Sequence, residues 1–258
     1  MRRIFRILRR TILILLLVGA ILLLGFFFLR WRGLILYSHE SNPDQWEVFG
    51  VDVSSYQGTV DWHALASQGV DFAFIKATEG SLLQDKQFAS NWKGSLEAGV
   101  RPGAYHFLSY DSPGETQADN FISMVPVTDG ALPPVVDIEF YGEYLENPPE
   151  KAQVQSILDP LLARLEAHYG VKPILYVTYR SYYSYLTDAK YADYPVWCSS
   201  PTVFPLVPRW HFWQYSHSAK LEGYTGAQPL IDLNVFRGSQ AEFDAFGLGS
   251  ELLISPSF

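Results

Sequence analysis

Beyond Val48, short apolar runs alternate with stretches whose apolar residues recur every three or four positions. The apolar runs predict strands at residues 49–54, 72–80, 101–107, 135–139, 173–177, 194–198, 211–215 and 230–234. The clearest helical pattern covers 153–169, where Ile157, Leu161 and Leu165 repeat at a spacing of four and Gly170 follows. Strands that alternate with helices indicate parallel strands.

The number and order of these elements predict the fold. Further helices are expected to start at Asp61 and to cover 88–98 and 115–124, whereas helices between the last three strands are short or missing. Eight strands in about two hundred residues suit a closed barrel. We therefore predict an α/β fold, namely an irregular TIM-like (β/α) barrel with reduced helices in its second half.

Residues 1–32 form a separate segment. The run from Thr11 to Leu29 has no charge over 19 residues, enough to cross the ~30 Å core of a bilayer as a helix. A cleaved signal peptide is the alternative, but its apolar core is shorter and ends in a small-residue site of the A-x-A kind. Here the run ends in three phenylalanines and Leu29, followed by Arg30, which offers no site of this kind. The pattern therefore predicts a transmembrane helix before the barrel.

The charges around this helix predict its orientation. Five arginines precede the apolar run and two follow it, so the N-terminus is expected in the cytoplasm. We predict a single-pass cell-membrane protein with an extracytoplasmic barrel. Residues 1–32 would be a basic tail and signal anchor, 33–47 a tether, and 48–258 the barrel domain.

Composition narrows the range of functions. All 27 acidic residues but only 12 of the 19 basic residues lie after Arg32, which gives that part a net charge of −15. A nucleic-acid partner is not expected, because phosphate binding needs a basic surface. Cys198 is the single cysteine, so no intramolecular disulfide is possible, and the sequence shows no base arranged to activate it. Aromatic residues make up 16% of the chain, enough for a sugar-stacking cleft as well as a core.

The strand at 135–139 carries the first candidate chemistry. Asp137 and Glu139 are two residues apart, so a strand places both on one face with Ile138 on the other. Neighbouring carboxylates tend to have their pKa values pushed apart, which lets one act as an acid while the other stays ionised. A pair that caps a following helix or binds a structural cation is the alternative.

Polar residues also end most other predicted strands. In a barrel the carboxyl ends of the strands converge on one mouth, so these side chains are expected to form one site. They are Asp52, Lys76, Glu79, His106, Asp137, Glu139, Tyr176, Trp197, Gln214 and Asp232.

Six motifs in order resemble glycoside hydrolase family 25, the Chalaropsis-type lysozymes. They begin at Gly50 (GVDVSSYQG), Phe74 (FIKATEG), Gly103 (GAYHF), Asp137 (DIE), Trp213 (WQY) and Asp232 (DLN). The resemblance covers roughly 48–243. It implies a muramidase that hydrolyses the β-1,4 bond between N-acetylmuramic acid and N-acetylglucosamine in peptidoglycan. No cofactor or metal is implied.

The resemblance also implies the roles of individual residues. Glu139 would be the general acid and base, Asp137 its catalytic partner, and Asp52 and Asp232 would complete an acidic floor. Net retention of configuration is expected, with the 2-acetamido group of the substrate as nucleophile. Sugar contacts are expected at Tyr105, Tyr176, Trp197, Trp213, Gln214 and Lys76. For the four aromatic residues, core packing is the alternative.

Two other functions stay open at this point. A barrel that binds peptidoglycan as a scaffold without turnover would retain the cleft, although four unpaired acids in a pocket bring little to a pure binder. A hydrolase of another glycan, such as chitin, would use the same carboxylates.

Overall fold

The computed structural model describes residues 2–31, 46–201 and 203–247. These fall into two units that divide between Ser38 and His39. The first contains helix α1 (Arg2–Trp31), whose segment Leu8–Phe27 is long and apolar enough to cross a membrane. Of the predicted tether 33–47, only Trp46 and Glu47 lie within the described residues.

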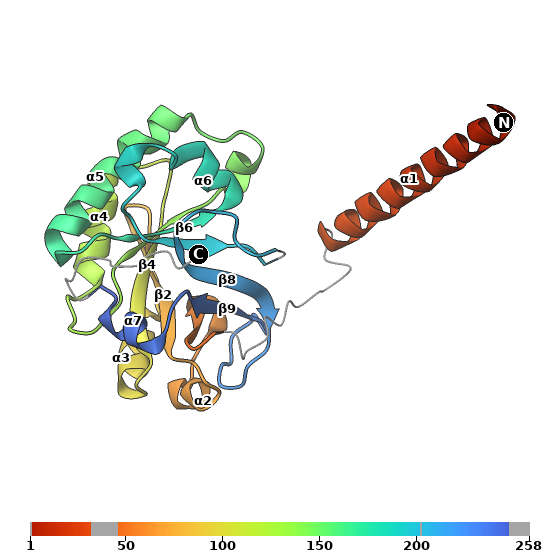
Figure 1. The fold of residues 1–258 in the computed structure, drawn as a ribbon. Coiled ribbons are helices and arrows are strands. Elements are labelled where there is room, and N and C mark those ends of the chain that lie inside the picture. Colours follow the sequence, from red (N-terminus) through yellow and green to blue (C-terminus); the bar gives the residue numbers. More distant parts are fainter. Residues whose placement is uncertain (1, 32–45, 202, 248–258) are drawn as a thin grey trace. The chain divides into compact units, whose positions relative to one another are not determined.

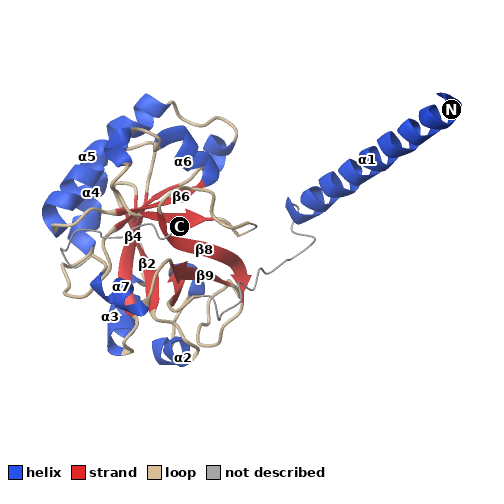
Figure 2. Cartoon of the chain, in the orientation of Figure 1, coloured by secondary structure: helices blue, strands red, loops and turns tan. Residues whose placement is uncertain are grey.

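The second unit is a mixed α/β fold around a closed barrel of eight strands (Figures 1 and 2). Around the barrel the strands follow the order β1, β9, β8, β7, β6, β5, β4 and β2, and β2 pairs with β1 to close it. Their bounds are Phe49–Val53 (β1), Phe72–Glu79 (β2), Arg101–Phe107 (β4), Val135–Ile138 (β5), Ile174–Thr178 (β6), Val196–Ser199 (β7), Trp210–Ala219 (β8) and Ile231–Phe236 (β9). A two-residue strand, β3 (Leu83–Gln84), adds to β2 outside the barrel.

One strand runs against the prediction. The barrel strands β1, β2, β4, β5, β6, β7 and β8 are parallel to one another. Strand β9 is antiparallel to both of its neighbours, β8 and β1. Only the short connection 220–230, without a helix, joins β8 to β9, so the chain turns back directly. The expectation that all eight strands are parallel was therefore wrong for the last one.

Helices cover the outside of the barrel (Figure 2). They are α2 (Trp62–Ser67), α3 (Phe88–Glu97), α4 (Gly114–Met124), α5 (Lys151–Tyr169) and α6 (Tyr179–Tyr185). The α5 helix buries Val154, Leu158, Leu161 and Leu165 and ends at Gly170, which has a positive φ of 72°. No helix is described between β7 and β8, where residues 200–201 and 203–209 form irregular structure.

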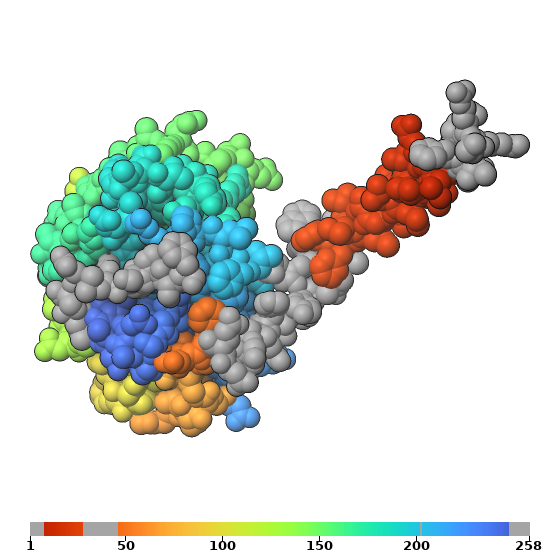
Figure 3. Space-filling view, viewed as in Figure 1, coloured from red at the N-terminus to blue at the C-terminus, as the bar shows by residue number. Residues whose placement is uncertain are grey.

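Helix α7 (Gln240–Ala245) closes the amino end of the barrel, and sequence patterns did not predict it. Phe243 and the following Phe246 join the interior rings of Phe72, Phe212 and Phe236. Arg101 donates hydrogen bonds to the carbonyl oxygens of Phe243 and Phe246. On the surface, α7 lies beside the start of the barrel, where Gln240 N donates to Glu47 Oε2 at 2.8 Å (Figure 3).

Candidate active site

Asp52 and Asp232 lie opposite each other on the antiparallel pair β1 and β9. Asp52 Oδ2 accepts hydrogen bonds from Asn234 Nδ2 at 2.8 Å and from Gln214 Nε2 at 2.9 Å. Gln214 Nε2 also donates to Asp232 Oδ2 at 3.2 Å. Burial raises the pKa of Asp52 to about 6 against these hydrogen bonds, and burial with the charge of Asp52 raises the pKa of Asp232 to about 8. Near neutral pH, Asp232 therefore retains its proton while Asp52 is largely ionised.

Asp137 is buried on β5, where its register partners are Phe107 on β4 and Tyr176 on β6. Its side chain has an Oδ1 atom without a hydrogen-bond partner among the described residues. Burial raises the pKa of Asp137, Glu139 raises it further, and the positive charge of Lys76 opposes both effects. A buried carboxylate oxygen without a protein partner is available to a donor on a ligand or a water molecule.

Glu139 directly follows β5 and is half-buried. Burial and then the charge of Asp52 raise the pKa of Glu139 to about 6, with Lys76 opposing. Lys76 itself is paired with Glu79 at 2.7 Å and lies 5.1 Å from the centre of the Phe107 ring. A carboxyl with a pKa near 6 can both give and take a proton near neutral pH.

A layer of interior side chains supports the acids. Tyr176 Oη donates to Gln214 Oε1 at 2.9 Å, and Trp197 Nε1 donates to Asn234 Oδ1 at 2.8 Å. Trp197 is only 2% exposed and stacks on Phe74. Tyr105 is half-buried, and the charges of Asp52 and Asp137 add to burial in raising its pKa, which places it beside the acids.

One predicted sugar contact, Trp213, and one predicted member of the mouth, His106, lie elsewhere. Trp213 is on the outer face of β8, where it packs on Trp46 and Trp210 and donates to Ser200 O at 2.9 Å. His106 also points outward, with its ring nitrogens bonded to Thr78 Oγ1 at 2.7 Å and Gln117 Oε1 at 2.9 Å. The alternation of strand residues explains both corrections, since each neighbours a residue on the inner face. Burial lowers the pKa of His106 to about 4.

Sequence reasoning missed several residues that hold the site. Asn234 belongs to the third position of the DLN motif, and its amide bridges Asp52 and Trp197. Tyr110 Oη donates to the carbonyl oxygen of Glu139 at 2.9 Å and its ring stacks on Tyr141. The period of two from Asp232 could have identified Asn234. No spacing rule connects Tyr110 to Glu139, because the two meet only through folding.

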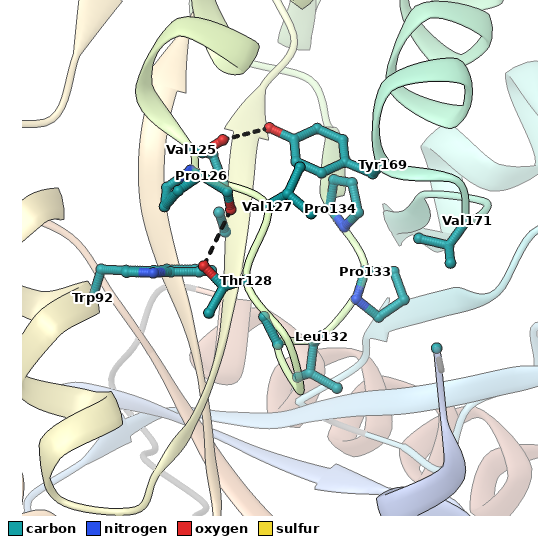
Figure 4. A pocket seen from close by; sticks show the side chains of 13 residues that line it. Trp92, Val125, Pro126, Val127, Thr128, Leu132, Pro133, Pro134, Tyr169 and Val171 are labelled. Atoms are coloured by element: carbon teal, nitrogen blue, oxygen red, sulfur yellow. Dashed lines mark hydrogen bonds between the residues drawn. The ribbon is translucent and has the colours of Figure 1, made fainter. Parts of the chain in front are cut away.

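An apolar hollow lies at the other end of the barrel (Figure 4). It is lined by Trp92, Val125, Leu132, Pro133 and Tyr169, among others, and Pro133 and Pro134 lead directly into the amino end of β5. None of the four acids lines it. Within the described ranges, no group of three or more His, Cys, Asp or Glu side chains is arranged to hold a metal ion.

A closed α/β barrel with several carboxylates at one mouth, all with raised pKa values and Glu139 near 6, has the acids that glycoside hydrolysis requires. The comparisons with known proteins agree with this class. The sequence profile of Glycosyl hydrolases family 25 matches residues 51–224. The chain belongs to this family, which confirms the resemblance seen in its motifs, and it is a glycoside hydrolase.

Its similarity to individual relatives extends over most of the barrel. Lysozyme M1 of Streptomyces globisporus is 34% identical over 213 residues, which cover 75% of this chain and 69% of that protein. A family 25 glycosyl hydrolase structure from Bacillus anthracis is 46% identical with a TM-score of 0.77, covering 83% of this chain and 99% of that one. A bacterial lysozyme structure from Streptomyces coelicolor is 33% identical with a TM-score of 0.68, covering 77% and 96%.

Proposed function

We propose that this protein is a membrane-anchored N-acetylmuramidase that cleaves the β-1,4 bond between N-acetylmuramic acid and N-acetylglucosamine in peptidoglycan, with net retention. Membership of family 25 and the similarity to lysozymes support the substrate class. The observation that carries the mechanism is the buried Oδ1 atom of Asp137, which has no protein partner.

In this proposal Glu139 is the general acid and base. Its pKa of about 6 leaves a protonated fraction near neutral pH, and its half-buried carboxyl remains accessible from the mouth. In the first step Glu139 gives its proton to the leaving glycosidic oxygen while the C1–O bond breaks. In the second step it takes a proton from the water that attacks C1.

Asp137 acts as the stabilising partner rather than the nucleophile. The oxygen of the substrate's 2-acetamido group attacks C1, and the acetamido N–H donates to Asp137 Oδ1. This hydrogen bond would supply the partner that the protein does not provide. Lys76 favours the ionised form of Asp137, because its positive charge opposes the effects that raise the pKa of Asp137.

The remaining predicted residues form the floor of the site, contact sugar or support the floor. Asp52, Asp232 and Gln214 are linked by hydrogen bonds and form a floor in which the ionised Asp52 favours the positive charge developing on the sugar ring. Tyr105 is proposed to contact sugar. Tyr176 and Trp197 are buried, so they support the floor from beneath rather than present an open stacking face.

The anchor is part of the proposal as well. The apolar segment Leu8–Phe27 of α1 would span the cell membrane with the N-terminus in the cytoplasm. The division into an anchor (1–32), a tether (33–47) and an extracytoplasmic barrel domain (48–258) goes with this topology.

Digestion of purified peptidoglycan by the full-length protein in detergent tests the proposed reaction. We expect new reducing ends at N-acetylmuramic acid, identified by reduction with borohydride and mass spectrometry, and initial release of the β-anomer by NMR. New reducing ends at N-acetylglucosamine, or cleavage of chitin at a similar rate, would contradict the bond assignment. Binding without cleavage would favour the scaffold alternative.

The route through the acetamido group has its own test. Peptidoglycan that has been de-N-acetylated at muramic acid should resist cleavage, because the proposed nucleophile is missing. Acetylating the same material again with acetic anhydride is the matched control and should restore cleavage. A covalent sugar adduct on Asp137, Asp52 or Asp232 would overturn this mechanism.

A further inference from the structure

An apolar patch lies on the outer wall of the barrel between α6 and the segment 200–209. We call Tyr183, Val203, Phe204 and Leu206 the wall patch; their side chains are 56%, 46%, 52% and 72% exposed. Leu206 is held next to Tyr183, whose hydroxyl donates to its carbonyl oxygen at 3.5 Å. Other exposed apolar side chains of the described barrel are mostly single, such as Tyr56, Leu96, Val127 and Leu145. A contiguous exposed apolar patch indicates an interaction surface.

Several backbone groups beneath the wall patch form hydrogen bonds with side-chain hydroxyls. Leu206 N donates to Tyr179 Oη at 2.7 Å, and this hydroxyl donates to Phe204 O at 3.1 Å. Ser200 Oγ donates to Val203 O at 2.7 Å. The apolar side chains can therefore enter a water-poor environment while these polar groups stay paired, as lipid contact requires.

The described chain enters the barrel unit beside this patch. Trp46, the first described residue of that unit, packs on Trp210 and Trp213 with ring centres 5.6 and 6.2 Å apart. Phe204 packs on the same two rings at 5.6 and 5.5 Å. Trp46 and Phe204 pack on the same two tryptophans, so the described chain enters the barrel unit on the side that carries the wall patch.

The charge around the patch differs from that of the barrel as a whole. The part of the chain after Arg32 has 27 acidic residues, yet none lies between Asp193 and Glu222. The cations on this side of the barrel are Arg209, which is exposed and whose charge acts on Tyr182 beside Tyr183, and Arg237, which lies 5.2 Å from the Trp210 ring. Aromatic and cationic side chains around an apolar surface suit the interface of a bilayer with anionic lipids.

We propose that the wall patch docks on the surface of the lipid bilayer, with Phe204 and Leu206 inserted among the headgroups. The inference rests on the proposed membrane anchor. Phe204 packs on outward-facing Trp213, whereas the neighbouring Gln214 faces the acids inside, so the wall patch and the acids lie on opposite faces of β8. The bilayer then holds the barrel in one orientation, and the glycan enters from the side away from the lipid.

Site-specific quenching in vesicles tests the proposal with the full-length chain. Leu206→Cys, in a Cys198→Ser background, carries an environment-sensitive fluorophore in vesicles of phosphatidylcholine and phosphatidylglycerol with brominated acyl chains. The control is Leu82→Cys, 90% exposed near β2, which lies opposite β7 in the strand order. We expect at least threefold stronger quenching at position 206 than at position 82. We also expect the quenching to weaken when phosphatidylglycerol is left out.

Flotation of the same vesicles after a high-salt wash distinguishes failure of the docking proposal from failure of the anchor proposal. Protein that floats but shows equal quenching at both positions would overturn docking and leave the anchor intact. Protein that does not float would overturn the anchor and docking together. Energy transfer between labels at position 206 that rises with protein density, without lipid quenching, would assign the patch to a second copy of the chain and also overturn the proposal.

Discussion

Single carboxyl groups in the mouth differ in charge because their surroundings differ. Glu139 is half-buried with a pKa raised to about 6, whereas Asp232 is raised to about 8 by burial and by its neighbour Asp52. Asp52 remains the more acidic of this pair because it accepts hydrogen bonds from two amides. The same functional group can therefore serve as proton donor, as neutral hydrogen-bond donor or as fixed negative charge.

The first prediction concerns Glu139. Glu139→Gln should lower kcat on peptidoglycan by about 10²–10⁴-fold, since the amide cannot deliver a proton to the leaving oxygen. Release of reducing ends measures the rate, and the unfolding temperature should be unchanged or higher. Glu115→Gln, the same change at an exposed position of α4, is the control and should retain activity. A folded Glu139→Gln protein with near wild-type turnover would contradict the assignment of Glu139 as the general acid and base.

The second prediction concerns the cost of burying Asp232. Its pKa in the folded protein, about 8, exceeds the unfolded value of 3.8, so the folded state binds the extra proton between these values. The free energy of unfolding contributed by this group therefore falls as pH rises from about 4 to 8. Asp232→Asn removes the titration and retains a donor toward Asp52, so it should raise the Tm at pH 8 and change it little at pH 4.

Calorimetry at both pH values measures this difference. About 1 kcal/mol corresponds to roughly 2–4 °C for a domain of this size. Asp129→Asn, at an exposed turn position, should give no difference between the two pH values. An equal shift of the Asp232→Asn protein at pH 4 and pH 8 would show that its charge is not the cause.

Individual elements show where local sequence patterns predicted the secondary structure and where they did not. The predicted strand 135–139 appears as β5 with Asp137 at the mouth, and the predicted helix 153–169 appears within α5. Both are long or apolar enough for local pattern to dominate. Helices α6 and α7 are seven and six residues long, and their patterns are too short to stand out. They form because Thr178 and Ser239 cap them and the barrel covers their buried residues.

The third prediction tests how α7 is held. Arg101→Met removes the hydrogen bonds to Phe243 O and Phe246 O and the contact of the guanidinium with the Phe243 ring. We expect the free energy of unfolding in urea to fall by about 2–3 kcal/mol, because charged donors to buried carbonyls are lost. Lys93→Met is the control. Lys93 forms only an exposed pair with Glu97 at 3.7 Å, so its loss should cost less than about 0.5 kcal/mol.

At the scale of the whole molecule, helix α1 and the barrel belong to distinct units with opposite surface character. The described side chains of α1 are exposed and, after Thr11, apolar, whereas the barrel buries its apolar residues in two layers, inside the strands and beneath the helices. The solved Bacillus anthracis structure, matched over 99% of its length, corresponds to the barrel alone. In the proposed function, the barrel carries the chemistry and α1 sets the location.

The fourth prediction follows from this division. Full-length protein made in a bacterial host should stay in the membrane fraction after a high-salt wash, because apolar helix contacts do not depend on ionic strength. Protease added to cells with a permeable outer layer should digest the barrel and spare a small N-terminal fragment. Recovery of mature protein that begins beyond Arg32 would instead show that the segment is a cleaved signal.

The sequence by itself determined the parts that depend on local period and composition. These are the apolar segment of α1, most strand positions, the pair Asp137 and Glu139 on one strand, and the six motifs that identify the family. A period of two or four is a property of the chain and is visible before folding.

Only the tertiary structure decided which side of the barrel wall each side chain occupies and which distant groups meet. It directed Trp213 and His106 outward, joined Asn234 to Asp52, and reversed β9. The reason is physical: register, the direction of a strand and the burial that shifts a pKa depend on neighbours that are far away in sequence.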